Sequence, residues 1–527
     1  MNLNRHLLHL FAVVVVLTAS GILRSDARNG DYKREMKQWC ETEVPYSHSC
    51  LMYTRRTYDG GGRMDRSVFF QFSLQAALSR AILAGADLRR MRKHSKYEEN
   101  VWIDCEKLYS NTVIQLNRTV LSMEYSRPCD FQTWLSAALT NVDMCSKIFE
   151  TDGDGTPDSM KMIASLSSLS KYNVPELISN CLAINEPLVL DNATANYKLT
   201  ETMRRNLGSS VKADIVVAKD GSGRYNSVAA AVAAGTRMRR RKGKRLVIYV
   251  KSGVYSETVN IPNSMDDVTL IGDGKGKTII TGRRSVKSGY TMITCATVAV
   301  FGDGFVAKDL TFRNTYGPGS QGVALLVASD SAVIHRASIE GYQDTLCVFS
   351  QRQFYRDCDI YGTIDFIFGN AAVVIQKCNI YARKPLHGES NVITAQARTD
   401  PNQNTGIIIQ FCKILSSKEF WPVHRTVKSY LGRPWKKYAR TVYLQSYISG
   451  IIDPKGWMPW RGSFALDTLY YAEFKNTGFG SRRSRRVKWS GYHIIRSSSS
   501  LTQFTVKNFI AGGMWIPNTG TPFKAAF

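Results

Sequence analysis

The stretch Ala337-Ser-Ile339-Glu-Gly341 is followed by Cys358-Asp-Ile360-Tyr-Gly362 and then by Cys378-Asn-Ile380-Tyr-Ala382. Two further copies, Leu310-Thr-Phe312-Arg-Asn314 and Cys412-Lys-Ile414-Leu-Ser416, extend the series, whose steps are 27, 21, 20 and 34 residues. Short alternating apolar runs separated by Gly, Asn and Asp are typical of strands and turns. A period near 20 residues predicts an all-β parallel β-helix, whose coils must stack to bury their inner faces.

Two aspartates, Asp344 and Asp365, each lie three residues after the glycine that ends a repeat. Because stacked strands are about 4.8 Å apart, we expect the two carboxyls to lie about 5 Å from one another. Two carboxyls at that distance do not ionise easily together, so one tends to stay protonated while the other stays charged. This arrangement suits a general acid beside a nucleophile or base. The alternative is that each aspartate only adopts the turn geometry that follows a glycine.

Cys358 and Cys378 occupy the same position in successive repeats. Their expected Cα separation lies within the range that a disulfide spans, so the register predicts a disulfide between them. The alternative is a ladder of buried thiols, because free cysteine packs as a small apolar side chain.

A resemblance to a known family rests on five strings that follow one another along the chain. They are Gly253-Val-Tyr-Ser-Glu257, Gln321-Gly-Val-Ala-Leu325, Gly341-Tyr-Gln-Asp-Thr-Leu-Cys347, Gly362-Thr-Ile-Asp-Phe-Ile-Phe-Gly369 and Leu431-Gly-Arg-Pro-Trp435. In this order they resemble plant pectin methylesterases, over residues 212–527. The resemblance implies a right-handed parallel β-helix that hydrolyses galacturonate methyl esters of pectin homogalacturonan, with no metal or cofactor.

The same resemblance implies roles for individual residues. Asp365 would be the nucleophile that forms an aspartyl acyl-enzyme, and Asp344 the general acid that later acts as the base. Two glutamines match the groups that stabilise the oxyanion, an arginine matches the group that bonds the nucleophile, and an aromatic residue matches the sugar subsite: Gln321, Gln343, Arg433 and Trp435. Without the resemblance, the glutamines could simply cap a coil and the arginine could be a surface cation.

Several neighbours of these residues depart from the pattern of the family. Cys347 stands where tyrosine is usual, Gly322 where alanine is usual, Leu326 where arginine is usual, and Ala397 where glycine is usual. Loss of an aromatic side chain near Asp344 could change how a sugar stacks. We therefore expect the activity to be shifted or reduced.

Residues 31–184 show helical periodicity instead, as in Trp134-Leu-Ser-Ala-Ala-Leu-Thr-Asn141. This region resembles the pectin methylesterase inhibitor family, which implies a four-helix bundle with disulfides Cys40–Cys50 and Cys105–Cys145. Ahead of it, residues 1–26 carry an apolar run followed by small residues. They predict a signal peptide, and hence a secreted cell-wall protein, with a signal anchor as the alternative.

Residues 185–211 form the expected linker between the two parts. Arg204 and Arg205 resemble the dibasic processing site of the family, where a protease would release the enzyme from an inhibitory or chaperoning pro-region. A plain basic linker is the competing interpretation. Asn117 and Asn192 begin sequons for N-glycosylation.

Charge is divided unequally along the chain of 527 residues. Residues 1–207 hold 25 Lys and Arg against 23 Asp and Glu, whereas residues 208–527 hold 44 against 20. The second part therefore carries 24 of the 26 net positive charges, which predicts attraction to a polyanion such as partly de-esterified pectin. The predicted signal peptide argues against nucleic acid as the partner. Other expected partners are proteinaceous inhibitors and the processing protease, and the expected state is a monomer.

Three functions remain open at this point. The first is pectinesterase activity. The second is chain cleavage by another β-helix enzyme that degrades polysaccharides. The third is a catalytically impaired wall protein that binds pectin through its basic face.

Overall fold

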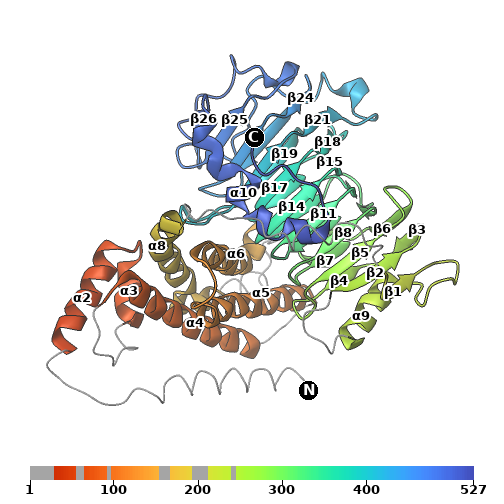
Figure 1. The fold of residues 1–527 in the computed structure, drawn as a ribbon. Helices are drawn as coiled ribbons and strands as arrows, with labels where there is room; N and C mark the ends of the chain where they lie inside the picture. The colour runs from red at the N-terminus through yellow and green to blue at the C-terminus, as the bar shows by residue number, and fades with distance from the viewer. Residues whose placement is uncertain (1–28, 55–63, 92–95, 153–165, 193–211, 239–244) are drawn as a thin grey trace.

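The computed structural model describes residues 29–54, 64–91, 96–152, 166–192, 212–238 and 245–527 (Figure 1). The predicted signal peptide and the dibasic pair Arg204 and Arg205 lie outside these residues. An N-terminal group of helices packs beside a long stack of parallel strands, and the strands lie in the C-terminal part of the chain, from Ile215 onward.

The helical domain, as we name the part from α2 to α8, is a bundle in which four long helices pack on one another. Its helices are α2 Asn29–Thr42, α3 Ser47–Thr54, α4 Arg66–Arg90, α5 Lys96–Leu121, α6 Pro128–Asp152, η2 Ser168–Tyr172 and α8 Val174–Asn192. Asp65 begins α4 by accepting a 2.8 Å hydrogen bond from the Val68 amide, which satisfies one of the free donors of the first turn. By length and composition α4 could cross a membrane, but its apolar side chains form the buried core of the bundle.

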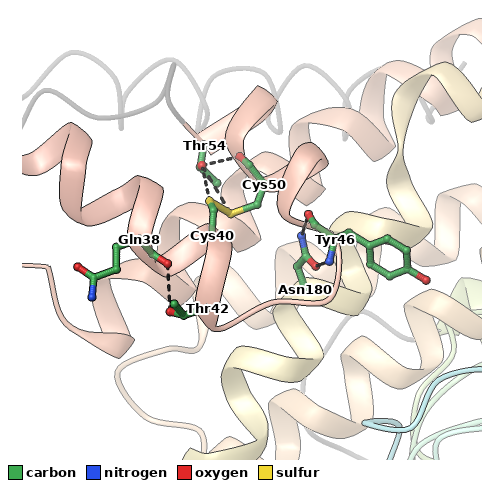
Figure 2. Close-up of a disulfide and its surroundings, with 7 residues drawn as sticks. All are labelled: Gln38, Cys40, Thr42, Tyr46, Cys50, Thr54 and Asn180. Carbon is green, nitrogen blue, oxygen red and sulfur yellow. Dashed lines mark hydrogen bonds between the residues drawn. A yellow bond between two sulfur atoms is a disulfide. The ribbon is translucent and has the colours of Figure 1, made fainter.

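Two disulfides stabilise the helical domain, in the predicted pairing. Cys40–Cys50 joins α2 to α3 (Figure 2), and Cys105–Cys145 joins α5 to α6. Thr54 lies beside the first disulfide, and its hydroxyl donates to the carbonyl oxygen of Cys50 at 2.6 Å. Each disulfide closes a loop and so reduces the entropy of the unfolded chain.

The strands form three parallel sheets, one for each side of a β-helix. The eleven-stranded sheet contains β1 Ile215–Val217, β2 Leu246–Val250, β5 Val268–Ile271, β8 Val306–Lys308, β11 Ala332–His335, β14 Arg352–Arg356, β17 Ala372–Gln376, β20 Gly406–Gln410, β23 Arg440–Leu444, β25 Tyr470–Phe474 and β26 Tyr492–Ile494. The seven-stranded sheet contains β4 Val259–Ile261, β7 Val298–Val300, β10 Leu325–Ala328, β13 Leu346–Ser350, β16 Ile367–Gly369, β19 Asn391–Gln396 and β22 Ser429–Pro434. The eight-stranded sheet contains β3 Gly253–Ser256, β6 Thr278–Gly282, β9 Thr311–Asn314, β12 Ser338–Glu340, β15 Asp359–Gly362, β18 Asn379–Ala382, β21 Lys413–Ser416 and β24 Tyr447–Ile448.

The repeat found in the sequence is the register of the eight-stranded sheet. Ile339 pairs with Phe312 on one side and with Ile360 on the other, and Ile380 continues the row to Ile414. All five side chains are buried inside the β-helix. The predicted parallel β-helix is therefore confirmed, and the helix α9 Val228–Met238 packs on its first strands.

Other segments cover two of the outer faces. The C-terminal segment, with η7 Ser499–Phe504, α10 Val506–Phe509, η8 Gly512–Met514 and η9 Ile516–Thr519, packs on the eleven-stranded sheet. The helical domain packs on the seven-stranded sheet, where apolar side chains of both parts form one buried cluster. The remaining short 3-10 helices are η4 Val286–Ser288, η5 Trp421–Val423 and η6 Phe479–Ser481.

The predicted disulfide between Cys358 and Cys378 is wrong. Both are buried thiols that lie in one inward-facing row with Cys412. The Cys358 amide donates to the Cys378 sulfur at 3.3 Å, and the Cys378 amide donates to the Cys412 sulfur at 3.3 Å. Because each sulfur accepts a backbone N–H, it links neighbouring coils without a covalent bond. Burial also raises the pKa of the Cys358 and Cys378 thiols well above its usual range.

Counting free thiols tests the assignment of Cys358 and Cys378 as unpaired cysteines. The chain has eleven cysteines, of which four form the two disulfides and seven are thiols. We expect alkylation of the denatured but unreduced full chain to label seven cysteines, including Cys358 and Cys378, and alkylation after reduction to label all eleven. Peptide mass spectrometry provides the measurement. A tryptic peptide pair joined through Cys358 and Cys378 would contradict the thiol assignment.

Candidate active site

The two aspartates lie at equivalent turns of neighbouring coils. Asp344 lies two residues before Leu346 and Asp365 two residues before Ile367, and these two apolar residues pair in the register of β13 and β16. Both aspartates have left-handed backbone conformations, with φ of 61° and 49°. Asp is among the few residue types that adopt this conformation readily. The Asp344 amide donates to the carbonyl oxygen of Ile364 at 3.0 Å, so the turns are stacked directly on one another.

Arg433 holds the carboxylate of Asp365. Its Nε lies 2.8 Å and 3.1 Å from the two carboxylate oxygens, and its Nη2 lies 2.5 Å from Oδ2. The arginine comes from β22. One strand, β19, lies between β22 and β16, the strand that follows Asp365, and Arg433 pairs with Ala395 of β19. Arg433 also lies over the Trp460 ring, 4.3 Å from its centroid, and this aromatic was not predicted from the sequence.

Asp365 is buried, with 6% of its surface exposed. Burial and the positive charge of Arg433 have opposite effects on its pKa. Burial raises the pKa of Asp365 above its usual range, although the Arg433 guanidinium lowers it. Pairing with Arg433 therefore offsets only part of the effect of burial on the pKa of Asp365. The carboxylate depends on its arginine, because a buried carboxyl without a cation stays protonated to a higher pH.

The two predicted glutamines lie at the same edge of the seven-stranded sheet. Gln321 precedes β10, Gln343 precedes β13, and both are half-buried. The Gly322 amide donates to the carbonyl oxygen of Gln343 at 3.1 Å, which places the two glutamine segments on adjacent coils beside Asp344. Trp435 follows at the end of β22, where its ring meets Phe368 edge-on at 6.0 Å.

A single row of side chains crosses the outer face of the seven-stranded sheet and ends at Arg433. Its members are Ala299, Leu326, Cys347, Phe368 and Ala395, in the order of β7, β10, β13, β16 and β19. All five are buried in the cluster shared with the helical domain. Two of the residues that depart from the family pattern therefore form the apolar floor on which the helical domain rests. Burial raises the pKa of the Cys347 thiol well above its usual range, so it remains protonated.

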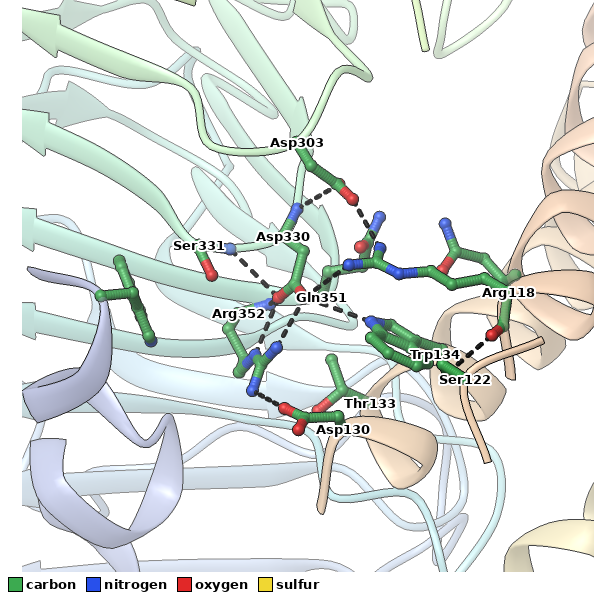
Figure 3. Close-up of polar contacts among 12 residues, drawn as sticks. Arg118, Ser122, Asp130, Thr133, Trp134, Asp303, Asp330, Ser331, Gln351 and Arg352 are labelled. Atoms are coloured by element: carbon green, nitrogen blue, oxygen red, sulfur yellow. Dashed lines mark hydrogen bonds and ion pairs between the residues drawn. The ribbon is translucent and has the colours of Figure 1, made fainter. Parts of the chain in front are cut away.

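A buried network of charges joins the two parts of the chain (Figure 3). Arg352 of β14 donates to Asp330 at 2.8 Å and 2.7 Å, and to Asp130 of α6 at 2.6 Å. The Trp134 indole donates to Asp330 at 3.2 Å, and Arg118 of α5 donates to Asp303 at 2.5 Å. Each charge in this network has a partner of opposite sign, which offsets the cost of burying it.

Further polar contacts run along α6. Gln132 donates to the carbonyl oxygen of Asn402 at 2.6 Å, Asn404 donates to Thr133 at 3.0 Å, and Asn370 donates to Thr140 at 2.9 Å. At the end of this line, Lys436 lies 3.8 Å from Asp143. Lys436 directly follows Trp435, which itself packs against the shared cluster. The helical domain therefore reaches the aromatic residue that the sequence assigns to the sugar subsite.

The motif Trp134-Leu-Ser-Ala-Ala-Leu-Thr-Asn141, which marked the helical region in the sequence, lies in α6 and carries much of this interface. Its polar residues could have signalled a contact surface, but the partners on the β-helix could not be found from the sequence. Asn117 is half-buried within α5, beside Arg118. Asn192 is the last residue of α8, and its side chain lies outside the described part of the structure. Glycosylation at both positions stays a prediction.

A buried carboxyl group at the interface between the two parts of the chain should make the stability of the protein depend on pH. Asp104 of α5 bonds the Thr291 hydroxyl, and burial raises the pKa of Asp104 to about 6 from an ordinary value of 3.8. A carboxyl whose pKa is higher in the folded state stabilises that state below its unfolded pKa and loses this contribution as the pH rises through 6. We expect the unfolding free energy of the full chain to fall by up to roughly 3 kcal/mol from this group between pH 4 and pH 7.

Replacing Asp104 by asparagine keeps the shape of the side chain and removes its titration. Asp104→Asn is expected to lose less stability than the parent chain over the same pH range, as measured by denaturant titration at each pH. Glu41→Gln, at an exposed position of α2, serves as the control and should behave as the parent. An unchanged pH dependence in Asp104→Asn would contradict the assignment.

Comparisons with known proteins agree with this geometry. The Pectinesterase family matches residues 214–513, and the Plant invertase/pectin methylesterase inhibitor family matches residues 34–184. The chain is 46% identical to Pectinesterase 2 of Citrus sinensis, over 98% of this chain and 99% of that protein. It is also 46% identical to the Probable pectinesterase/pectinesterase inhibitor 59 of Arabidopsis thaliana, over 93% and 94% of the two chains. Among solved structures, it is similar to the pectin methylesterase from carrot, with 50% identity, a TM-score of 0.59, and coverage of 61% of this chain and all of that one.

Proposed function

Because the chain belongs to the pectinesterase family and is a pectinesterase, we propose that it hydrolyses the methyl esters of galacturonate in pectin homogalacturonan. The products would be methanol and a polymer with free carboxylates. The observation that carries the proposal is the buried Asp365 carboxylate held by Arg433, one coil away from Asp344.

The reaction would proceed through an acyl-enzyme on Asp365. A carboxylate oxygen of Asp365 attacks the ester carbonyl carbon at C6, and the carbonyl oxygen becomes an oxyanion. Side-chain amides of Gln321 and Gln343 would donate to that oxyanion, each contributing on the order of 3 kcal/mol by analogy with other oxyanion holes. As the tetrahedral intermediate collapses, the C–O bond to the methoxy group breaks and Asp344 gives its proton to the leaving methanol.

The second half of the reaction restores both aspartates. Asp344, now ionised, takes a proton from a water molecule, and the resulting hydroxide attacks the carbonyl carbon of the acyl-enzyme. The bond to Asp365 breaks, which returns its carboxylate to Arg433 and leaves a free galacturonate carboxyl. Arg433 would act in both halves by favouring the charged form of Asp365, which opposes the rise in pKa that burial causes.

The surroundings of the site support a carbohydrate polymer as the substrate. Trp435 and Trp460 lie beside Arg433 and offer ring faces of the kind on which sugars pack. The excess of 24 positive charges in residues 208–527 favours a polyanion, in a manner that salt would weaken. The disulfides of the helical domain fit an oxidising compartment, in accord with secretion to the cell wall.

Methanol release tests the reaction. We expect the full chain to release methanol from highly methylated pectin, and Asp365→Asn to lower the rate at least about a hundred-fold, because an amide is a poor nucleophile. Asp467→Asn, at an exposed turn, is the matched control and should keep the parent rate.

Two outcomes would contradict the proposal. New reducing or unsaturated chain ends without methanol would favour a polysaccharide-cleaving enzyme. Pectin binding without methanol release, in a folded chain and in variants that free the cleft, would favour a catalytically impaired wall protein.

The helical domain would act as an inhibitory pro-region in the intact chain. It covers the row of side chains that ends at Arg433, and its Asp143 contacts Lys436 next to Trp435. A processing protease at the linker, or separate inhibitor proteins after processing, would then control access of pectin to the cleft.

Reversing one charge at the interface tests whether the helical domain inhibits the intact chain. Arg118→Glu places a carboxylate against Asp303, so docking weakens and we expect the full chain to release methanol at least about five-fold faster. Adding Asp303→Lys restores an opposite pair and should return the rate toward that of the parent. Glu41→Gln should change nothing. Equal rates in the parent and in Arg118→Glu, with both chains folded, would contradict an inhibitory role.

A further inference from the structure

A groove of about 770 Å³ lies between the end of the eight-stranded sheet and the beginning of β22. Its walls come from β21, η5, β24 and the segment that contains η6. None of the residues assigned to the reaction above lines this groove. The groove is therefore separate from the aspartate pair.

Large aromatic side chains of the groove are exposed to solvent. Trp421 is 60% exposed, Phe479 is 65% exposed, and Tyr447 is 44% exposed. One face of the Trp421 indole stacks on the His424 ring, with centroids 4.4 Å apart and planes 14° from parallel. His424 Nδ1 also bonds the carbonyl oxygen of Trp421, which fixes this pair. Trp421 therefore presents a rigid aromatic platform, and gathered exposed aromatics mark binding surfaces.

The charged groups around these rings are mainly cationic. Arg425 and Lys428 line the groove and are exposed, and the Arg482 guanidinium lies 4.2 Å from the centroid of the Phe479 ring. Asp453 is the acid of the lining, and its carboxylate accepts from the Lys455 amide at 2.8 Å. Such a surface attracts an anionic ligand.

The lining therefore combines exposed ring faces with cations. Ring faces on which a sugar packs, beside cations that pair with an anion, together match a sugar that carries a carboxylate.

The position of the groove allows it to act while the cleft is covered. Figure 1 shows β21 and β24 on the side of the β-helix that faces away from the helical domain. Lys428 directly precedes β22, and Arg433 lies five residues further along the chain, which is about 17 Å of extended strand. One polymer chain could therefore lie in the groove and continue toward the active site.

We propose that this groove is an accessory site for a carboxylated oligosaccharide, which packs a sugar ring on Trp421 and pairs its carboxylates with Arg425 and Lys428. The preference for an anionic sugar follows from the residues of the groove, whereas the choice of galacturonate rests on the proposed function. Through this site the intact chain would bind a uronate polymer before the helical domain leaves the cleft.

Binding of tetragalacturonic acid to the full chain tests the proposal by isothermal titration calorimetry. The Asp365→Asn background is used, so that the result does not depend on catalysis. We expect Trp421→Ala to raise Kd at least about ten-fold, because an aromatic anchor of a binding site is removed. Arg425→Gln together with Lys428→Gln should raise Kd about three- to ten-fold at low salt, with a smaller effect at high salt.

Matched controls come from exposed residues outside the groove. Phe464→Ala, at an aromatic residue 42% exposed, and Arg496→Gln should each leave Kd unchanged. A neutral galactose tetrasaccharide should bind at least about ten-fold more weakly than the uronate, since it has no carboxylates to pair. Melting curves should coincide for all variants, because the substituted side chains are exposed.

The outcomes separate this proposal from the esterase reaction. An unchanged Kd in Trp421→Ala, or equal loss in Phe464→Ala, would overturn the accessory site even if methanol is released. Equal binding of a DNA oligonucleotide and the uronate, insensitive to Trp421, would also overturn it, since charge alone would then explain the attraction. Binding that requires Trp421 would support the groove even if the chains that keep Asp365, both the parent and Arg118→Glu, release no methanol. That result would contradict the esterase reaction alone.

Discussion

The in-register stacking of parallel coils is the constraint on which the rest of this structure depends. Ile339, Ile360 and Ile380 lie above one another inside the β-helix, and they fix which residue of each coil faces inward. A slip of one residue would turn every side chain of a strand to the opposite face. The same register places Asp344 and Asp365 at equivalent turns. The relative position of these two aspartates is thus a consequence of how the apolar core is stacked.

At the candidate active site, burial of Asp365 and the positive charge of Arg433 have opposite effects on the pKa of Asp365. Asp365 is buried deeply enough for its pKa to be raised, and it keeps a cation because β22 carries Arg433 across the neighbouring strand. Removing a charged carboxylate from water is costly unless a partner compensates it. The compensation comes from a residue 68 positions away along the chain, and two coils of the β-helix are needed to bring it there.

The outer face of the seven-stranded sheet carries the apolar contact with the helical domain and ends at Arg433. If the proposed function holds, the same face also has to bind a sugar, which needs exposed aromatic and polar side chains, whereas a docked helical domain needs an apolar floor. In this chain the floor contains Leu326 and Cys347, and both are buried in the cluster shared with the helices. Burial of these apolar side chains favours the docked arrangement, and the charge network of Arg352, Asp330 and Asp130 gives that arrangement its orientation.

The sequence by itself determined the parallel β-helix, the pairing of Asp344 with Asp365 and the helical nature of the first part, because each depends on a local period or motif. It could not decide between a disulfide and two thiols at Cys358 and Cys378. One position per coil is compatible with both, and only the folded structure shows which bonds the sulfurs make. Tertiary structure alone decided that burial raises the pKa of Asp365 and that the helices cover the row ending at Arg433. It also decided that Trp421 lies in a cationic groove. These features depend on residues that are distant in the chain, and folding brings them together through packing that no local pattern encodes.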